Sequence, residues 1–204
     1  MKIQMNNVIL ASASPRRKEL LKSIFSEFEI LPADVDENVD FNVPVEQYPE
    51  KLAELKAEAV ARENKNSLVI GCDTIVLCDK KIYGKPANKK DAINMIKSLS
   101  GKTHQVITGC CLCYKGDKVC FSSVTDVEFY QLSDEEIENY VEIKEPENTG
   151  STVKYQWQDK AGGYGIQSAG VFLVKGIKGD YNNVVGMPVS ELYRNIKKFT
   201  EKTI

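Results

Sequence analysis

The stretch LVIGCDTIVL, residues 68–77, indicates the fold class of this chain. Aliphatic side chains occupy both of its alternating faces, and Gly71 and Asp73 interrupt them on one face. A strand that is apolar on both faces is covered on both sides, as in the middle of a sheet that lies between helices. The stretch therefore predicts the central strand of an α/β fold.

Helix and strand patterns alternate on both sides of this stretch. Ser14 followed by Pro15 is typical of a helix start, and a capping box is expected where Ser133 precedes a predicted helix. A hairpin signal lies at residues 115–117, so we expect a mixed sheet. No composition shift marks a linker, and residues 1–204 are predicted to form a single domain. Strands are predicted over residues 8–11, 28–31, 68–77, 82–83, 105–114, 118–130 and 171–174. Helices are predicted over residues 49–62, 89–99 and 133–143, and two further helices are predicted to begin at Pro15 and Pro188.

The composition excludes several classes of function. The 27 Lys+Arg and 29 Asp+Glu give a formal net charge of −2, which argues against a protein that coats nucleic acid. The single histidine, His104, excludes a zinc site built on several histidines and is expected to be structural. Cys111 and Cys113 share a strand face that Cys110 does not, which is poor geometry for one shared metal.

The same composition bears on location. No segment reaches the length of a membrane span, so no membrane partner is expected. The N-terminus lacks the apolar core of a secretion signal. The chain is large enough to fold without a disulfide framework, so its six cysteines are expected to be reduced. These observations predict a cytoplasmic protein.

The segment SASPRR, from Ser12 to Arg17, lies between a predicted strand and a predicted helix. Backbone N–H groups and the helix dipole suit phosphate at such a helix start. Arg16 and Arg17 oppose that dipole in the first turn, so they need an anion or an acidic partner nearby. A phosphate site and an ordinary helix cap with solvated arginines are both open at this point.

Asp73 is an acid in the middle of the otherwise apolar central strand. A carboxylate is costly in such a place unless it binds a metal or pairs with a cation. Gly71, two positions earlier on the same face, leaves room for close approach. The position therefore indicates either a functional carboxylate or a buried structural ion pair.

Other charged residues are candidate site residues, but the sequence pattern around them is less specific. The acidic loop that contains Asp36 and Glu37 could supply oxygen ligands to Mg²⁺, or it could simply lie in solvent. Lys56 edges the inward face of its predicted helix, and Lys85 follows a strand end. Each of these two lysines could equally be an ordinary surface residue.

The glycines gather near the C-terminus, where seven of the 13 fall between Gly162 and Gly186. The loop from Ala161 to Gln167 permits close approach of its backbone to a ligand. Gln167 offers both an amide donor and an amide acceptor. A plain glycine-rich loop is the alternative interpretation.

These candidates belong to an ordered set of blocks that covers nearly the whole chain. The blocks are Ser12-x-Ser14-Pro15-Arg16-Arg17, Asp36-Glu37, Lys56, Gly71-x-Asp73-Thr74, Lys85-Pro86, Ser100-Gly101-x-Thr103-His104, Glu145-Pro146 and Asp159-Lys160-Ala161-Gly162-x-Tyr164-Gly165-Ile166-Gln167. The set resembles the Maf family of nucleoside triphosphate pyrophosphatases. The resemblance implies a mixed twisted sheet with flanking helices, arranged as two lobes around a central cleft, as in inosine triphosphatase-like enzymes.

The resemblance also implies a reaction and a cofactor. A nucleoside triphosphate would be hydrolysed to the monophosphate and pyrophosphate with a divalent cation, Mg²⁺ or Mn²⁺, and Co²⁺ as a further candidate. Asp73 matches the family's proposed proton acceptor and would hold the metal together with Glu37. Lys56 and Lys85 match functional positions in the same site.

Substrate preference is implied by three positions, Arg16, Thr74 and Gln167, which match the subgroup that acts on dTTP and UTP. The expected substrate contacts are Ser12, Ser14, Arg16, Arg17, Thr74 and Gln167. A 7-methyl-GTP pyrophosphatase and a non-enzymatic regulator of cell division are the alternatives. No nucleic-acid partner is expected, and a homodimer is left open.

One segment departs from the family pattern. About a dozen residues, 147–158, are inserted just before the glycine-rich loop, and they include the only tryptophan, Trp157. A lid, an oligomer contact and a surface excursion are all open interpretations of this insertion.

Overall fold

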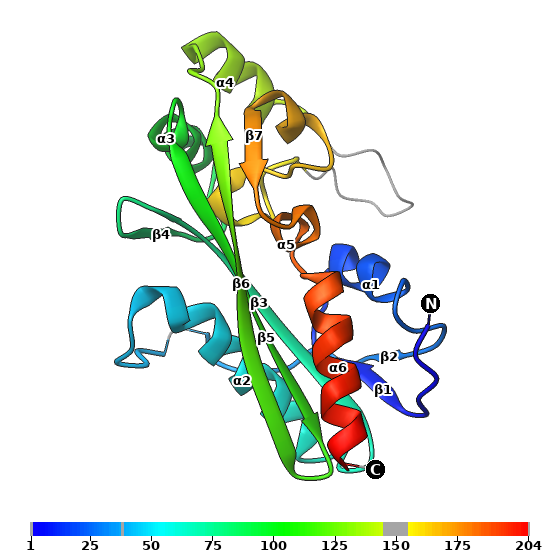
Figure 1. Cartoon of the computed structure of the whole chain (residues 1–204). Helices are drawn as coiled ribbons and strands as arrows, with labels where there is room; N and C mark the ends of the chain where they lie inside the picture. Colours follow the sequence, from blue (N-terminus) through cyan, green and yellow to red (C-terminus); the bar gives the residue numbers. More distant parts are fainter. Residues whose placement is uncertain (1, 38, 145–154, 204) are drawn as a thin grey trace. The chain divides into compact units, whose positions relative to one another are not determined.

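The computed structural model describes residues 2–37, 39–144 and 155–203 (Figure 1). Most of the predicted insertion, residues 147–154, lies outside the described part. The chain divides into two compact units. The first unit comprises residues 1–74, 107–124 and 180–204, and the second comprises residues 75–106 and 125–179. That residues 1–204 act as a single domain stays a prediction.

The predicted mixed α/β fold is confirmed. Seven described strands form one sheet in the order β2-β1-β3-β5-β6-β7, and β4 pairs with β3. β1 runs parallel to β2 and β3, whereas β4 is antiparallel to β3 and β7 is antiparallel to β6. The elements are β1 (Val8–Leu10), α1 (Pro15–Leu21), β2 (Glu29–Ile30), η1 (Val45–Gln47), α2 (Tyr48–Ala61), β3 (Leu68–Cys78), β4 (Lys81–Tyr83), α3 (Lys89–Leu99), β5 (Thr103–Tyr114), β6 (Asp117–Phe129), α4 (Asp134–Val141), η2 (Ala161–Gly163), η3 (Ala169–Phe172), β7 (Val174–Lys178), α5 (Tyr181–Val185) and α6 (Val189–Thr203).

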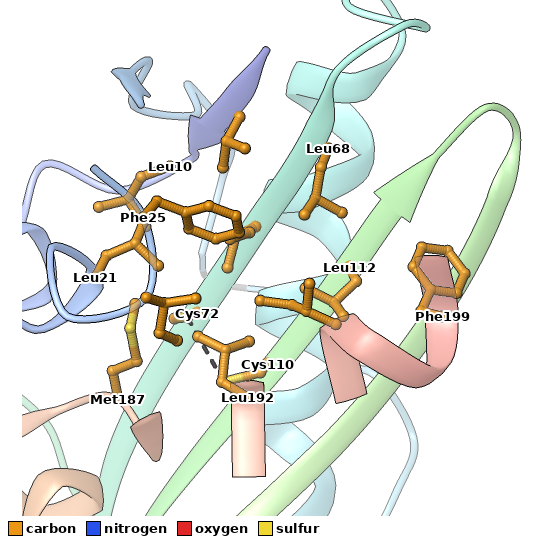
Figure 2. Packing of buried hydrophobic residues seen from close by; sticks show 14 residues of the cluster. Leu10, Leu21, Phe25, Leu68, Cys72, Cys110, Leu112, Met187, Leu192 and Phe199 are labelled. Atoms are coloured by element: carbon orange, nitrogen blue, oxygen red, sulfur yellow. Dashed lines mark hydrogen bonds between the residues drawn. The ribbon is translucent and has the colours of Figure 1, made fainter. Parts of the chain in front are cut away.

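The central strand of the prediction, β3, is buried along its length except at Thr74, which is half-buried. Its even-numbered residues Leu68, Ile70 and Cys72 belong to an apolar cluster with side chains of α1 and α6 (Figure 2). On the opposite face, Val69 packs in a second cluster with alanines of α2. Because side chains alternate along a strand, Gly71 and Asp73 share the face of Val69. Asp73 is therefore placed on the side of the sheet that α2 covers.

Two glycines let α2 lie close to this face. A Cβ atom added at Gly71 would come within 2.2 Å of the backbone oxygen of Ala53. A Cβ atom added at Gly109, on the neighbouring strand β5, would come within 2.3 Å of the backbone of Pro49 and Glu50. The close approach expected at Gly71 is thus an approach of helix backbone to strand. It fixes the position of the helix that carries Lys56.

The second unit has its own buried aromatic group. His104, Phe129 and Tyr164 pack edge to face with ring centroids 4.8–5.4 Å apart. The ring Nε2 of His104 lies 2.7 Å from the Tyr164 hydroxyl, and His104 is 1% exposed. The histidine therefore anchors the glycine-rich loop to β5. Its structural role was predicted, but its partner on that loop was not.

His104 is expected to make the protein acid-sensitive. Burial lowers its pKa from 6.5 to about 4, so the folded protein binds its proton more weakly than the unfolded chain does. The free energy of unfolding is therefore unaffected by this ring above pH 6.5 and decreases as the pH falls towards 4. At 1.36 kcal/mol per pKa unit, the full decrease is about 3 kcal/mol. Because the sequence has a single histidine, NMR titration of its ring protons measures this directly. A midpoint near 6.5 in the folded protein would contradict the prediction.

The strand predicted over residues 171–174 is wrong. η3 occupies Ala169–Phe172, and β7 begins only at Val174. Phe172 is 78% exposed, so this apolar side chain does not mark the buried face of a strand. β7 lies at the edge of the sheet, where hydrogen bonds to β6 define a strand more than an apolar pattern does. The short helix α5 was also not predicted.

The other predicted helices lie within two residues of their expected ends, and both predicted caps are present. Ser14 accepts a hydrogen bond from the Arg17 N–H, and Ser133 forms a capping box with Glu136. Within the described residues, no helix is long and apolar enough to cross a membrane.

Candidate active site

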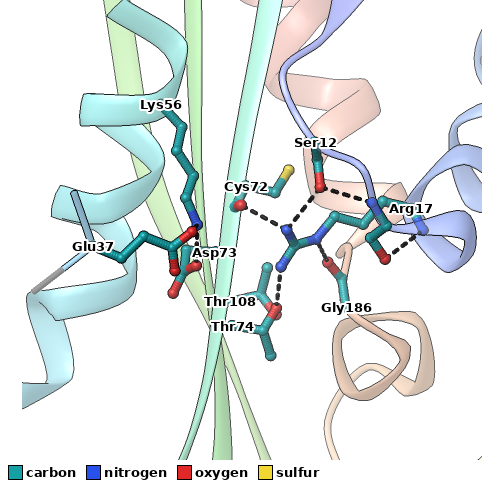
Figure 3. A network of polar contacts seen from close by, with 10 residues as sticks. Ser12, Arg17, Glu37, Lys56, Cys72, Asp73, Thr74, Thr108 and Gly186 are labelled. Carbon is teal, nitrogen blue, oxygen red and sulfur yellow. Dashed lines mark hydrogen bonds and ion pairs between the residues drawn. The ribbon is translucent and has the colours of Figure 1, made fainter. Parts of the chain in front are cut away.

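The first unit brings three of the predicted site residues into direct contact. Lys56, from α2, places its Nζ 2.7 Å from Asp73 Oδ1 and 2.9 Å from Glu37 Oε1 (Figure 3). The side chains of Lys56 and Asp73 are 10% and 12% exposed, whereas that of Glu37 is 56% exposed. The ammonium group therefore bridges a buried carboxylate and one that reaches solvent. Asp73 does pair with a cation, as its position in the strand required.

The charges of this group do not cancel. Two carboxylates face one ammonium group, which leaves a net negative charge at a point that is open to solvent on the Glu37 side. A net negative charge next to water attracts a cation, and carboxylate oxygens are the ligands that Mg²⁺ and Mn²⁺ prefer. The local charge thus permits a cation in addition to Lys56.

A divalent cation fits this group if water and substrate phosphates supply its remaining ligands. In the part of the chain that the structure describes, no cluster of three or more His, Cys, Asp or Glu side chains could enclose a metal ion. Mg²⁺ is commonly bound by one or two carboxylates together with water and substrate phosphates. Asp73 and Glu37, which converge on one point, suit that mode of binding. The donor set therefore fits a cation that is completed by its substrate.

Arg17 is the centre of a second polar network in the same unit. Its Nε donates to the backbone oxygen of Gly186 at 3.0 Å, and its Nη1 donates to Ser12 Oγ at 3.1 Å and to the backbone oxygen of Cys72 at 2.8 Å (Figure 3). Its Nη2 donates to Thr74 Oγ1 at 3.0 Å. Four of the five guanidinium N–H groups are thus used within the protein.

This network ties together three segments that are distant in sequence. Arg17 joins the loop of Ser12, the turn after α5, and the strand residue just before Asp73. All four acceptors are neutral oxygens, so the positive charge of Arg17 persists beside that loop. The sequence predicted an anion or an acidic partner for this arginine. The structure instead gives it a positioning role, with a charge that still favours an anion at the loop.

Two buried residues that the sequence did not single out complete the network. Thr108 Oγ1, on β5, donates to the backbone oxygen of Asn183 at 3.2 Å and lies 2.9 Å from Thr74 Oγ1. Since Thr108 has one hydroxyl proton and gives it to Asn183, Thr74 must donate to Thr108. Thr74 therefore uses its proton within the protein and accepts from Arg17. Nothing in the local sequence pattern marks Thr108, because its role depends on strand pairing and on α5.

Replacement of Arg17 by Lys tests whether this residue organises the site. Lysine keeps the charge but cannot reproduce a planar fork with four hydrogen bonds. At about 1 kcal/mol for each net hydrogen bond, the unfolding free energy is expected to fall by about 3 kcal/mol. Chemical denaturation measures the loss, and Arg194→Lys, at an exposed position of α6, is the matched control. Equal stability of the two variants would contradict the positioning role.

The remaining predicted residues are placed as follows. Ser14 caps α1, Ser12 Oγ accepts from Arg17 and from the Ser14 N–H, and Arg16 is half-buried at the start of the helix. Lys85 and Gln167 belong to the second unit, where both are exposed. In the first unit, the candidates thus form two groups, one around Lys56 and one around Arg17, whereas Lys85 and Gln167 lie in the second unit.

The end of the predicted insertion is tied to the loop of Gln167. Trp157 is 5% exposed, and its Nε1 donates to the backbone oxygen of Val141 at 3.0 Å. Gln156 accepts a hydrogen bond from Ser168, the residue that follows Gln167. The last residues of the insertion are therefore part of the folded second unit. No local sequence pattern predicts these contacts.

The fold places the chain in a structural class of α/β proteins. The Ham1 protein of Staphylococcus aureus superposes with a TM-score of 0.53, covering 95% of this chain and 99% of that protein. The two sequences are 15% identical, so the likeness concerns the fold alone.

More particularly, the chain belongs to the Maf family. The family model described as Maf-like protein matches residues 7–199. A dTTP/UTP pyrophosphatase of Bacillus anthracis is 45% identical over 195 residues, which cover 96% of each chain. A protein of the same name from Thermosipho africanus is 46% identical over 186 residues, which cover 91% of this chain and 90% of the relative. The family predicted from the ordered motifs is confirmed.

Proposed function

We propose that this chain hydrolyses dTTP and UTP to the nucleoside monophosphate and pyrophosphate in the presence of a divalent cation. The observation that carries the proposal is the contact of Lys56 with Asp73 and Glu37 on the face of β3 covered by α2. Relatives that are 44–46% identical over most of the chain carry the name dTTP/UTP pyrophosphatase, which supports the substrate class.

Asp73 is the proton acceptor of the proposed reaction. Lys56 holds one of its oxygens at 2.7 Å, which fixes the orientation of the carboxylate. The other oxygen is then available to take a proton from the attacking water. That water forms a bond to the α-phosphorus, and the bond between the α-phosphorus and the bridging oxygen breaks. Pyrophosphate leaves with the electron pair of that bond.

A cation would be held by Asp73 and Glu37. When bound, it would supply charge stabilisation for the phosphate oxygens. Arg16 and Lys85 would bind the triphosphate. Ser12 and Ser14 lie in the loop beside the positively charged guanidinium group of Arg17 and would contact the same substrate.

Gln167 is the proposed reader of the base. Its amide can accept a hydrogen bond from N3–H of thymine or uracil and donate one to the adjacent carbonyl oxygen. Cytosine and the purines do not present those two groups in the same arrangement. Thr74 contributes by positioning, because its hydroxyl group is hydrogen-bonded to Thr108 and to Arg17.

A panel of triphosphates tests the proposal. Release of pyrophosphate is measured for dTTP, UTP, CTP, GTP, ATP and 7-methyl-GTP with Mg²⁺, Mn²⁺ and Co²⁺ in turn. We expect kcat/KM for dTTP and UTP to exceed that for the other triphosphates by at least about a hundredfold. In ¹⁸O-labelled water, the label should enter the monophosphate. Preference for 7-methyl-GTP would favour the other enzymatic alternative, and no turnover of any triphosphate would favour the non-enzymatic one.

Location and assembly are part of the same proposal. A cytoplasmic enzyme, with a nucleoside triphosphate as its small-molecule partner, suits a reaction on the nucleotide pool, and its assembly is left open between a monomer and a homodimer. Fractionation of cells and sedimentation of the purified protein measure these two properties.

A further inference from the structure

The hairpin of β5 and β6 carries a pair of cysteines for which the proposed reaction has no use. Cys111 and Cys120 lie with their sulfur atoms 2.7 Å apart. The sulfur atoms of a second pair, Cys72 and Cys110, are 3.6 Å apart. Both contacts lie within the first unit. All four are free thiols.

The turn of this hairpin places Cys111 and Cys120 opposite each other. β5 ends at Tyr114 and β6 begins at Asp117, so a two-residue turn joins them. The turn residues Lys115 and Gly116 both have positive φ, 52° and 90°, as a tight type I′ turn requires. Each cysteine is three residues from the strand end that adjoins this turn. Residues opposite each other in an antiparallel pair have Cα atoms about 4.5–5.5 Å apart, which lies in the range that a disulfide spans.

The two thiols differ in access to solvent. Cys111 is fully buried, in the apolar cluster where Ala53 and Ala57 of α2 pack, whereas Cys120 is half-buried at the edge of that cluster. Hydrogen bonds with the thiols of Cys113 and Cys120, together with burial, raise the pKa of Cys111. A reagent in solution therefore reacts first with the thiol of Cys120. The thiol of Cys111 is buried and can react only with the modified Cys120.

We propose that Cys111 and Cys120 form a modification site at which hydrogen peroxide produces a reversible disulfide. The sulfur of Cys120 attacks one oxygen of the peroxide, the O–O bond breaks, and water leaves after proton uptake. The sulfur of Cys111 then attacks the sulfur of the resulting sulfenic acid, the S–O bond breaks, and a second water leaves with the proton of Cys111. Two thiols lose two electrons, which the peroxide accepts. A dithiol reductant reverses the reaction by exchange.

The cysteine pair lies on the face of the sheet that α2 covers, the helix that also carries Lys56. A disulfide there would fasten β5 to β6 beneath that helix. We expect it to raise the midpoint of thermal unfolding by a few degrees, because it restricts the unfolded chain. This inference does not depend on the proposed pyrophosphatase activity.

Peptide mass spectrometry of the full chain tests the proposal. The reduced protein is treated with hydrogen peroxide, its remaining thiols are blocked, and it is digested with trypsin without reductant. The expected product joins peptide 103–115 to peptide 119–144 and is lighter than their sum by two hydrogen atoms. It should form at least about tenfold faster than any product joining Cys72 to Cys110, since both of those thiols are fully buried.

Three variants assign the bond. Cys120→Ser and Cys111→Ser should each abolish the product, whereas Cys113→Ser should retain it. Cys113 is the necessary control because it lies on the same peptide, and its thiol also contacts that of Cys111. Should Cys111→Ser impair folding, the half-buried Cys120→Ser still decides the outcome. Loss of the product in Cys113→Ser alone, its persistence in Cys120→Ser, or its absence from the wild-type digest would overturn the proposal.

Discussion

Replacement of Asp73 by Asn is expected to lower the rate of pyrophosphate release from dTTP or UTP by roughly a thousandfold. Asparagine has nearly the same shape, but its amide cannot take a proton from water at neutral pH. The change also removes the buried carboxylate that lies 2.7 Å from Lys56. Steady-state kinetics at saturating substrate and cation measure the loss of kcat.

The companion measurements separate chemistry from folding. Because Glu37 still contacts Lys56, the unfolding free energy of Asp73→Asn should fall by no more than about 3 kcal/mol. Asp79→Asn, which alters an exposed carboxylate paired with Lys102, is the matched control and should keep nearly full activity. Near-normal turnover by Asp73→Asn would disprove the assignment of Asp73 as proton acceptor.

Replacement of Gly71 by Ala is expected to have the largest effect on stability. Its added methyl group would come within 2.2 Å of the Ala53 backbone oxygen and 2.9 Å of Ala57, which a side-chain rotation cannot relieve. Either α2 must move away from β3 or the strand must shift. Overpacking of this kind costs about 3 kcal/mol or more, which is a large share of the stability of a small protein. Chemical denaturation measures the loss.

The same substitution should affect the site as well as the fold. Movement of α2 carries Lys56 away from Asp73, so kcat is expected to fall in the fraction that remains folded. Gly176→Ala is the matched control, because a Cβ atom at Gly176, also in a strand, would meet nothing within 4 Å. Wild-type stability in Gly71→Ala would contradict the packing explanation.

Much of the fold could be predicted because its signals are local. The apolar stretch at residues 68–77 indicates a covered strand, and the cap residues Ser14 and Ser133 mark helix starts regardless of the rest of the chain. The edge strand β7 could not be found in this way. Its residues are defined by hydrogen bonds to β6, which lies 45 or more residues earlier in the sequence, and the apolar residues Val171 and Phe172 just before it are exposed.

The site was predicted unevenly for a similar reason. The cost of an isolated buried carboxylate predicted that Asp73 needs a partner, and helix periodicity put Lys56 on the inward face of its helix. Arg17 was interpreted as a residue that faces a ligand, yet most of its donors are used within the protein. Thr108 could not be predicted, because a buried threonine on a strand carries no local signal of its hydrogen bonds.

The sequence by itself determined the family, the central strand and the chemical types available for the site, because motif order, apolar periodicity and the cost of burying charge are properties of residues along the chain. Only the tertiary structure decided which groups meet. Lys56 reaches Asp73 because Gly71 and Gly109 allow α2 to lie against the sheet. Arg17 is directed inward because backbone oxygens of β3 and of the turn after α5 converge on it. Such contacts depend on strand pairing and helix packing, which bring distant residues together. No local sequence pattern at either position indicates them.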